Sequence, residues 1–453
     1  MSSDLQSLTR LSPDRIPVAP SDRSDQTHTD PNWLATLRRD ALASFEEQGL
    51  PTRRQEEWKG TNLAPLAAME FTRVGASPNF SIPMQEDVGP GPLLVFVDGA
   101  FDPAASRREK LPAGVRASSL AEVLRDEPES IKGYLGALTD PKIQPLVALQ
   151  TAFLSAGAVL VLDSGTTAPH PIRLRFISTG DAGDSGAGTS AAFPRLLVIA
   201  GEGSSLALVQ EHISSDDAPG LTAYVSEFHL AAGARVECLE VQAEAAARVH
   251  FTSLHARLEK NATFDSHVIT VADGLVRSEL LVELIEPNAA TKLCGLFMGQ
   301  KTAHLDHFTT VDHAAVNCTS DEEYRGVLAN ESKGVFRGRV IVRPGAQGTD
   351  TKQSNPNLLL SDRATIDTKP QLEIYADDIR ASHGSTIGQL DSDALFFLRA
   401  RGIDEAEAKR LLTGAYAHGV VARIQNEELR RVATTQVDAT LTQLEKSESG
   451  RPK

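Results

Sequence analysis

The pattern of hydrophobic and polar positions divides the chain into three regions. Between about residues 156 and 388, short β-rich runs follow one another, with Gly, Asn, Asp and Pro between them and no helical segment among them. Such a series is typical of a β-sandwich or of a β-solenoid. The runs are Val159–Leu162, Ile172–Ile177, Leu196–Ile199, Leu206–Val209, Ala223–Phe228, Val236–Val241, Val268–Val271, Val335–Val342 and Ile366–Tyr375.

A weak internal repeat favours the solenoid. Its unit is an aliphatic residue four positions before an alanine, and its first three matches recur after roughly 28 residues, within the range expected of stacked units. The matches are Leu230/Ala234, Leu258/Ala262, Ile285/Ala289 and Leu360/Ala364. In the first three, Gly233, Asn261 or Asn288 precedes the alanine, and these residue types suit a tight turn with a positive φ angle.

Helical spacing flanks the β-rich region on both sides. Pro31–Gly49 carries apolar residues three and four positions apart, and the same spacing returns in Asp391–Arg401, in a helix that begins at Asp404 and in Glu427–Leu444. We predict a disordered leader at 1–31, a mainly helical N-terminal domain at 32–155, a β core at 156–388, a C-terminal helical domain at 389–445 and a tail at 446–453.

Composition and charge exclude several classes of function. The 453 residues carry a formal net charge of −15, whereas a broad nucleic-acid surface needs Lys and Arg to neutralise phosphates. No apolar run approaches the roughly 18 residues that cross a bilayer. No apolar secretory segment opens the sequence, and the cysteines Cys238, Cys294 and Cys318 are odd in number and widely spaced. We therefore expect a cytoplasmic protein that binds neither nucleic acid nor membrane.

The common catalytic motifs do not occur. A P-loop requires Gly-x-x-x-x-Gly-Lys-Ser/Thr, and without this string we do not expect the chain itself to hydrolyse ATP. Ser382 and His383 are neighbours, but the Gly-x-Ser-x-Gly turn that exposes a nucleophile is missing. Asp377 and Asp378 could act as an acid–base pair only on a shared face, and adjacent residues of a strand face opposite ways.

Four residues with metal-binding side chains lie close together in the sequence, namely His304, His307, His313 and Cys318. Positions three apart share a face of a helix but not of a strand, and the segment Thr309–Val311 favours a strand. His304 and His307 should therefore point in opposite directions. There is no Cys-x-x-Cys pair, which argues against a preformed thiolate site. Ordinary surface and core histidines and a metal site both stay open as interpretations.

One segment is far more specific than these patterns. It runs through Val335–Gln347, Thr349–Asp362, Asp367–Asp378, Ser382–Gly384 and Asp391–Ile403. This block resembles the C-terminal half of the SufB/SufD family of iron–sulfur cluster assembly proteins. Near the N-terminus, Trp33–Phe45 and Gly49–Thr61 look like the leader helices of the SufD branch of that family. Together the matches bracket residues 33 to about 416.

The resemblance implies a fold and a set of partners. It implies a right-handed parallel β-helix between helical regions, and a scaffold subunit of a SufB–SufC–SufD complex that is non-catalytic alone. A SufB-like subunit would pair through the β-helix, and a SufC-like ABC ATPase would dock on the C-terminal helices, where Leu411, Leu412, Ala415 and Tyr416 are candidates. The isolated chain could form a homodimer. We expect no stably bound cofactor, although a transient iron–sulfur cluster at the SufB interface is compatible with the family, and flavin binding stays open.

The same resemblance singles out His383 as a candidate cluster ligand or sulfur-interface residue. Chains of the SufB branch carry glutamate after the matching histidine, whereas Gly384 follows here, as in the SufD branch. Many SufD-branch sequences have a cysteine two residues earlier, and this chain has Ala381. His383 is thus the one good metal ligand in Ala381–Gly384, because an imidazole nitrogen binds iron. A structural role at the end of the β-helix is the alternative.

Two other functional classes remain as alternatives. A secreted-type β-helix carbohydrate enzyme would need clustered carboxylates or basic residues and aromatic side chains for sugar stacking, but aromatic residues make up only 5% of this chain. A purely structural interaction solenoid would bind nothing except another protein. Copurification of an ABC-type ATPase would favour the scaffold over both.

Overall fold

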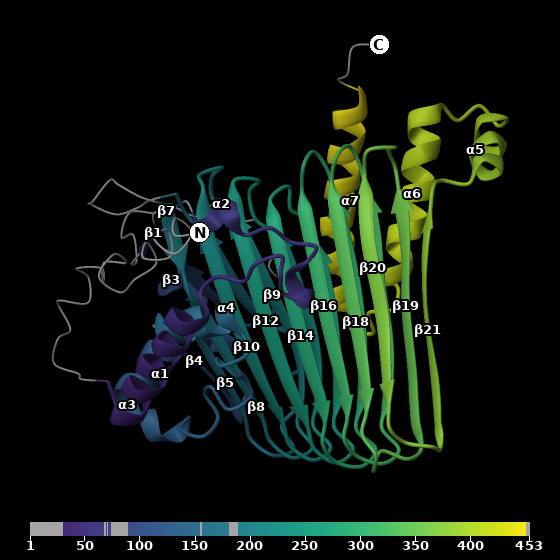
Figure 1. Cartoon of the computed structure of the whole chain (residues 1–453). Coiled ribbons are helices and arrows are strands. Elements are labelled where there is room, and N and C mark those ends of the chain that lie inside the picture. Colours follow the sequence, from purple (N-terminus) through teal and green to yellow (C-terminus); the bar gives the residue numbers. More distant parts are fainter. Residues whose placement is uncertain are drawn as a thin grey trace.

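The protein is a two-sheet solenoid whose strands run side by side from one end to the other (Figure 1). The computed structural model describes residues 30–67, 69, 71–73, 89–154, 156–180 and 189–449. Its strands form a parallel β-solenoid of about 7 turns with helices toward both termini, as the sequence predicted. The leader predicted at 1–31 lies outside the described residues, except for its last two positions.

Successive coils contribute one strand to each sheet. Sheet A contains, in spatial order, β20 (Thr365–Ile374), β18 (Lys333–Val342), β16 (His304–His313), β14 (Leu275–Leu284), β12 (Arg248–Leu258), β10 (Gly220–Leu230), β8 (Pro194–Ala200), β5 (Ala156–Leu162) and β4 (Val115–Ser119). In addition, β7 (Thr189–Ala192) pairs with β10, and β1 (Phe71–Arg73) pairs with β7. Sheet B contains β21 (Ile379–Gly388), β19 (Thr349–Leu359), β17 (Thr319–Leu328), β15 (Ala290–Gly299), β13 (Thr263–Thr270), β11 (Arg235–Ala243), β9 (Ser205–Ser214), β6 (Ile172–Ser178), β2 (Leu93–Val97) and β3 (Ala100–Arg107).

Parallel register and turn geometry confirm the repeat read from the sequence. Leu230 of β10 is the register partner of Leu258 of β12, and β11 pairs with β13 in the same parallel sense, which excludes a sandwich of antiparallel hairpins. Gly233, Asn261 and Asn288 have φ angles of 69°, 57° and 63°. Each precedes an alanine that is fully buried at the turn. The turn residues therefore set where one strand ends and the next begins.

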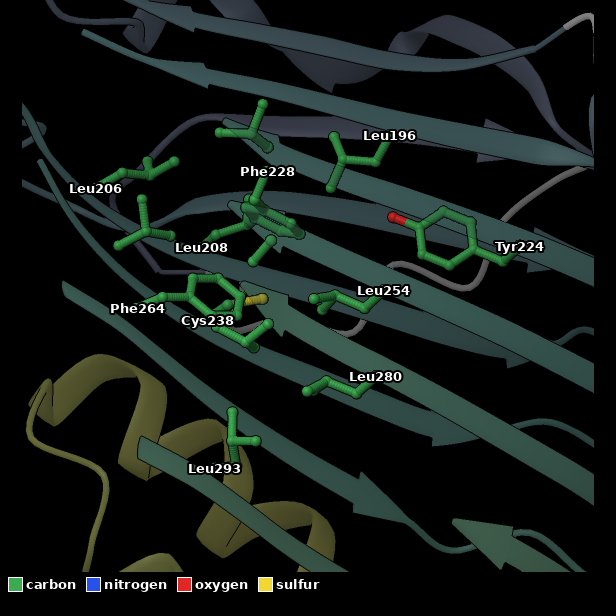
Figure 2. Packing of buried hydrophobic residues seen from close by; sticks show 14 of the residues in the cluster. Leu196, Leu206, Leu208, Tyr224, Phe228, Cys238, Leu254, Phe264, Leu280 and Leu293 are labelled. Carbon is green, nitrogen blue, oxygen red and sulfur yellow. The ribbon is translucent and has the colours of Figure 1, made fainter. Parts of the chain in front are cut away.

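The space between the two sheets, which we call the lumen, is filled by side chains that alternate along each strand (Figure 2). Phe228 of sheet A and Phe264 of sheet B meet there with ring centres 5.0 Å apart. Leu254 and Leu280 belong to the same cluster, and neither is more than 4% exposed. Burial of these side chains supplies the main free energy that holds the coils together.

The sheets begin before the domain boundary predicted at residue 156. Strand β2 pairs in parallel with β6, and β4 pairs antiparallel with β5. Every residue of β2 is buried, as expected for an apolar run covered on both faces. The remaining N-terminal elements are α1 (Asn32–Gln48), α2 (Ala64–Ala67), α3 (Leu120–Asp126) and α4 (Pro145–Ala152).

Two long helices cover the outer face of sheet B. They are α6 (Glu405–Val421) and α7 (Glu427–Ser449), and a shorter helix, α5 (Ser392–Arg399), precedes them (Figure 1). Asp404 caps α6 at the predicted start of this helix, because its carboxylate accepts a hydrogen bond of 3.1 Å from the amide of Glu407. Arg423, just after α6, binds Asp321 and Glu323 of β17 over 2.5 Å each. None of the helices in the described ranges is both long and apolar enough to span a bilayer.

A segment before α2, residues 56–61, lies across the outer face of sheet A and is called the strap below. The guanidinium of Arg277, on β14, lies 3.8 Å from the ring centre of Trp58 and 2.5 Å from a carboxylate oxygen of Asp306. Near the far end of the sheet, Lys369 of β20 forms a 2.8 Å ion pair with Glu56. The strap therefore connects an early segment of the chain to the coils that contain β14 to β20.

The turn at Asn261 provides a test of the coil geometry. Replacing Asn261 with valine should lower the free energy of unfolding by about 1–2 kcal/mol, because a β-branched side chain clashes with the backbone at positive φ. Replacing it with glycine should cost less than half as much, because glycine adopts this φ freely. Urea titrations of both variants measure the difference. Equal losses would show that the side-chain bond from Asn288 to Asn261, and not the φ angle, matters.

Candidate functional site

Both sheets finish in a strand with an unpaired edge, and we call this surface the open end (Figure 1). In the described sheets β20 pairs only with β18, and β21 pairs only with β19. Such an edge presents backbone donors and acceptors that can pair with another chain. Exposed apolar residues lie on these strands or directly after them, since Ile374, Tyr375 and Ile387 are 41%, 61% and 52% exposed. The open end therefore has the character of a protein-binding surface.

His383 lies on β21 at the open end. In the parallel register it is the partner of Gln353 on β19, which is buried in the lumen. In-register neighbours of parallel strands project to the same side of a sheet, so His383 holds the lumen-facing position of the last coil. No later coil covers it in the described chain, and its side chain is exposed. A single imidazole is thus presented where a partner could add further ligands.

Buried polar groups continue from this position into the lumen. Gln353 Nε2 donates a hydrogen bond of 2.7 Å to one carboxylate oxygen of Glu322, and the hydroxyl of Thr309 donates to the other. Burial raises the pKa of Glu322 to about 7. This carboxyl group therefore changes its protonation state near neutral pH, two coils behind the exposed histidine.

The cysteines of this chain do not extend the site. Cys238, Cys294 and Cys318 are all free and buried. Burial raises the pKa of each of the three thiols. Since the thiolate is the form that binds metal and attacks sulfur, these residues are held in their inert form.

The four clustered metal-binding residues do not converge. His304 lies on the outer face, where its Nε2 is 2.9 Å from the hydroxyl of Thr61, whereas the ring of His307 stacks on Phe297 in the lumen with centres 5.0 Å apart. This confirms the opposite orientation expected from strand alternation. His313 Nε2 is 2.9 Å from the hydroxyl of Ser320, and the Cys318 thiol donates to a backbone carbonyl.

The candidate docking residues on α6 differ in their surroundings. Leu411 is 39% exposed and Ala415 is also exposed, whereas Leu412 is half-buried. Tyr416 faces the solenoid, because the guanidinium of Arg325 on β17 lies 5.1 Å from its ring centre and donates a 2.7 Å hydrogen bond to its carbonyl oxygen. Leu411 and Ala415 are therefore accessible to a partner, and Tyr416 anchors the helix.

A more exposed apolar feature escaped the sequence reasoning. Phe396 and Phe397 on α5 are 74% and 54% exposed. The sequence did contain a signal for this exposed surface. Leu395–Leu398 is a run of four apolar residues on a short helix, and such a helix cannot bury all of its faces. A groove of about 250 Å³ lies beside α5 and is lined in part by Leu359, Leu395, Leu441 and Leu444. Exposed aromatic side chains of this kind are common anchors of protein interfaces.

Comparisons with known proteins converge on one family. The model described as "SUF system FeS cluster assembly, SufBD core domain" matches residues 181–416, and the model described as "SufBD protein N-terminal region" matches residues 22–174. The first match spans the coils from β7 onward, the open end and the beginning of α6.

Individual relatives agree with these models. The iron–sulfur cluster assembly protein SufD of Escherichia coli is 27% identical over 404 residues, which cover 88% of this chain and 91% of the relative. An iron–sulfur cluster assembly SufBD family protein of Synechocystis is 28% identical over 411 residues, covering 87% and 88%. The chloroplastic protein ABCI7 of Arabidopsis thaliana is 30% identical over 288 residues, covering 62% and 60%.

The buried carboxyl group at Glu322 predicts a pH-dependent stability. Its pKa of about 7 in the folded chain lies above its ordinary value of 4.5, so the folded state binds the proton more tightly. Stability from this group is complete below about pH 4.5 and is lost as the pH rises through 7, by up to about 3 kcal/mol. Glu322→Gln should therefore raise the free energy of unfolding at pH 8 and change it little at pH 4.5.

Urea titrations at the two pH values measure this difference. Glu331→Gln is the matched control, because its side chain is half exposed on a turn. The same pH dependence in the Glu322→Gln variant and in the unmodified protein would contradict the assignment.

Proposed function

The chain belongs to the SufBD family of SUF-system iron–sulfur cluster assembly proteins, and from this premise we propose that it is a SufD-like scaffold subunit with no catalytic step of its own. The observation that carries the proposal is the open end, where unpaired strand edges, exposed apolar residues and His383 occur together. Cluster assembly on a scaffold requires a docking surface and ligands at the same place, and this end offers both.

The partner proposed for the open end is a SufB-like subunit. Edge strands β20 and β21 can extend their sheets by pairing with strands of a second solenoid, since β-strand addition satisfies the free backbone groups. Ile374, Tyr375 and Ile387 would then be removed from water, which adds hydrophobic free energy to the backbone pairing. A second copy of this chain could use the same edges when the SufB-like partner is missing.

The cluster itself is cargo in this proposal. His383 offers one imidazole, and the protonated buried thiols of this chain offer no sulfur ligand. The remaining ligands must then come from the partner subunit or from sulfide, so a cluster forms only at the assembled interface and does not reside on the isolated chain.

ATP hydrolysis would be supplied by a SufC-like ATPase bound to the C-terminal helices. The exposed Phe396 and Phe397 of α5, with Leu411 and Ala415 of α6, form the accessible apolar surface proposed for this contact. Tyr416 would act indirectly, by holding α6 against Arg325. Because α6 and α7 cover the apolar face of sheet B, deleting them would expose that face, and point substitutions are the better test.

The docking proposal predicts the effect of removing the two aromatic rings. The double variant Phe396→Ala/Phe397→Ala should reduce copurification of the ATPase at least tenfold from native lysate, because buried aromatic anchors dominate interface energies. Thermal stability should stay within a few degrees, since both rings are mostly exposed. Ile143→Ala is the matched control, because Ile143 is also 74% exposed but lies in the N-terminal region. Unchanged ATPase recovery in the double variant would place the docking surface elsewhere.

The interface proposal predicts a separate effect of His383. His383→Ala should impair the maturation of iron–sulfur enzymes in cells without lowering the yield of the complex or its melting temperature, because the side chain is exposed. Ser382→Ala is the control, since the neighbouring residue of β21 projects to the opposite face. Normal cluster maturation in the His383→Ala variant would assign the histidine a structural role. Loss of the SufB-like partner would instead assign it to packing of the interface.

A further inference from the structure

Three potential metal ligands meet in the lumen, far from the open end. They are His212 on β9, Glu240 on β11 and His250 on β12, and each is no more than 2% exposed. One donor atom from each lies within 4.8 Å of the other two, and His212 Nε2 is 3.8 Å from a carboxylate oxygen of Glu240. No other group of three such residues this close occurs among the described residues.

The imidazole nitrogens in this group lack hydrogen bonds. Within the described part of the chain, both ring nitrogens of His212 and the Nε2 of His250 are buried without a hydrogen-bond partner. An unsatisfied polar group in a protein interior costs about 1–3 kcal/mol. Three such atoms beside a carboxylate are therefore costly unless something in the lumen binds them.

The contact between His250 Nδ1 and Glu244 determines which ring nitrogen of His250 carries the lone pair. Glu244 Oε2 lies 2.5 Å from His250 Nδ1, and its other oxygen accepts hydrogen bonds from Ser178 and Thr222 over 2.7 and 2.9 Å. A carboxylate held in this way keeps the proton on Nδ1, which leaves the lone pair of Nε2 directed toward His212 and Glu240. Histidines that bind metals commonly have such a carboxylate behind them.

Neighbouring aromatic rings fix the position of the His212 ring. It stacks on Phe176 with centres 5.0 Å apart and meets the edge of Tyr224 at 4.6 Å. A neutral imidazole keeps a lone pair on one of its ring nitrogens for a ligand. Gln242 Nε2 donates a 2.7 Å hydrogen bond to Glu240 Oε1, which fixes the carboxylate oxygen that lies 3.8 Å from His212 Nε2.

We propose that His212, Glu240 and His250 bind one divalent first-row transition-metal ion inside the solenoid, with Glu244 orienting His250. Two imidazoles and one carboxylate match the preferences of Zn²⁺ and Fe²⁺, whereas Mg²⁺ and Ca²⁺ prefer oxygen ligands throughout. Bonds of about 2.0–2.2 Å require the donor atoms to approach to about 3.5 Å, which small side-chain rotations achieve.

The ion would have a structural role separate from cluster assembly. His212 and Glu240 belong to sheet B and His250 belongs to sheet A, so one ion would cross-link the two sheets. Metal binding of this kind adds directly to the free energy of folding. The site does not rest on the proposed scaffold function, and either proposal can fail without the other.

Metal analysis of the purified full-length chain tests the proposal. The chain is produced in medium supplemented with Zn²⁺ or with Fe²⁺, freed of surface metal by brief chelation and analysed by mass spectrometry. We expect about one ion per chain, with the two arms deciding which ion is preferred. The double variant His212→Gln/His250→Gln should contain at least tenfold less. His307→Gln is the matched control, because His307 is a buried lumen histidine whose nitrogens also lack partners.

Several outcomes would overturn the proposal. They are an unmodified chain without metal in both arms, full metal content in the double variant, and equal loss in the His307→Gln control. If the double variant does not fold, Glu240→Gln decides, because it keeps the shape of the side chain and removes the charged ligand. That variant should lose the metal and retain its circular dichroism. A Co²⁺-substituted chain should show ligand-field bands without sulfur charge transfer, and their absence would contradict the ligand set.

Discussion

The fold depends on one requirement, that both edges of every strand find a backbone partner. Parallel stacking of coils gives each inner strand a partner on both edges. The strands of the terminal coils have a partner on one edge only. At the N-terminal end, the edge strands β3 and β4 also pair on one side only, in the antiparallel sense with β2 and β5. At the other end, the edge strands β20 and β21 pair with β18 and β19 on one side, and no further strand of the described chain pairs with their outer edges. The association proposed for the open end would give these last edges a backbone partner.

The sequence predicted features whose causes are local. The positive φ of Asn261, the N-cap at Asp404 and the helix α1 each depend on a few neighbouring residues, and each appears where expected. Family resemblance placed His383 on the solenoid, but its exposure depends on the register of β21 against β19 and on the end of coil stacking. Residue spacing alone contains neither fact.

Contacts between distant residues could not be predicted in this way. Trp58 and Arg277 meet only because the strap crosses sheet A, and His212, Glu240 and His250 meet only because three strands bring their lumen-facing positions to one level. The sequence search looked for metal ligands close together in the chain and therefore found His304 and His307, which strand alternation separates. In a solenoid, ligands that share a site come from different strands, and His212 lies a full coil before Glu240.

The strap also constrains the order in which the molecule can form. Its residues leave the ribosome early, but their binding surface is built from β14 to β20, which are synthesised more than 200 residues later. The Glu56–Lys369 ion pair closes one of the longest loops in the chain, and contacts of such sequence separation form late in folding. A chain cut short before residue 369 would lack this clasp. The complete set of strap contacts therefore requires that synthesis has reached the final coil.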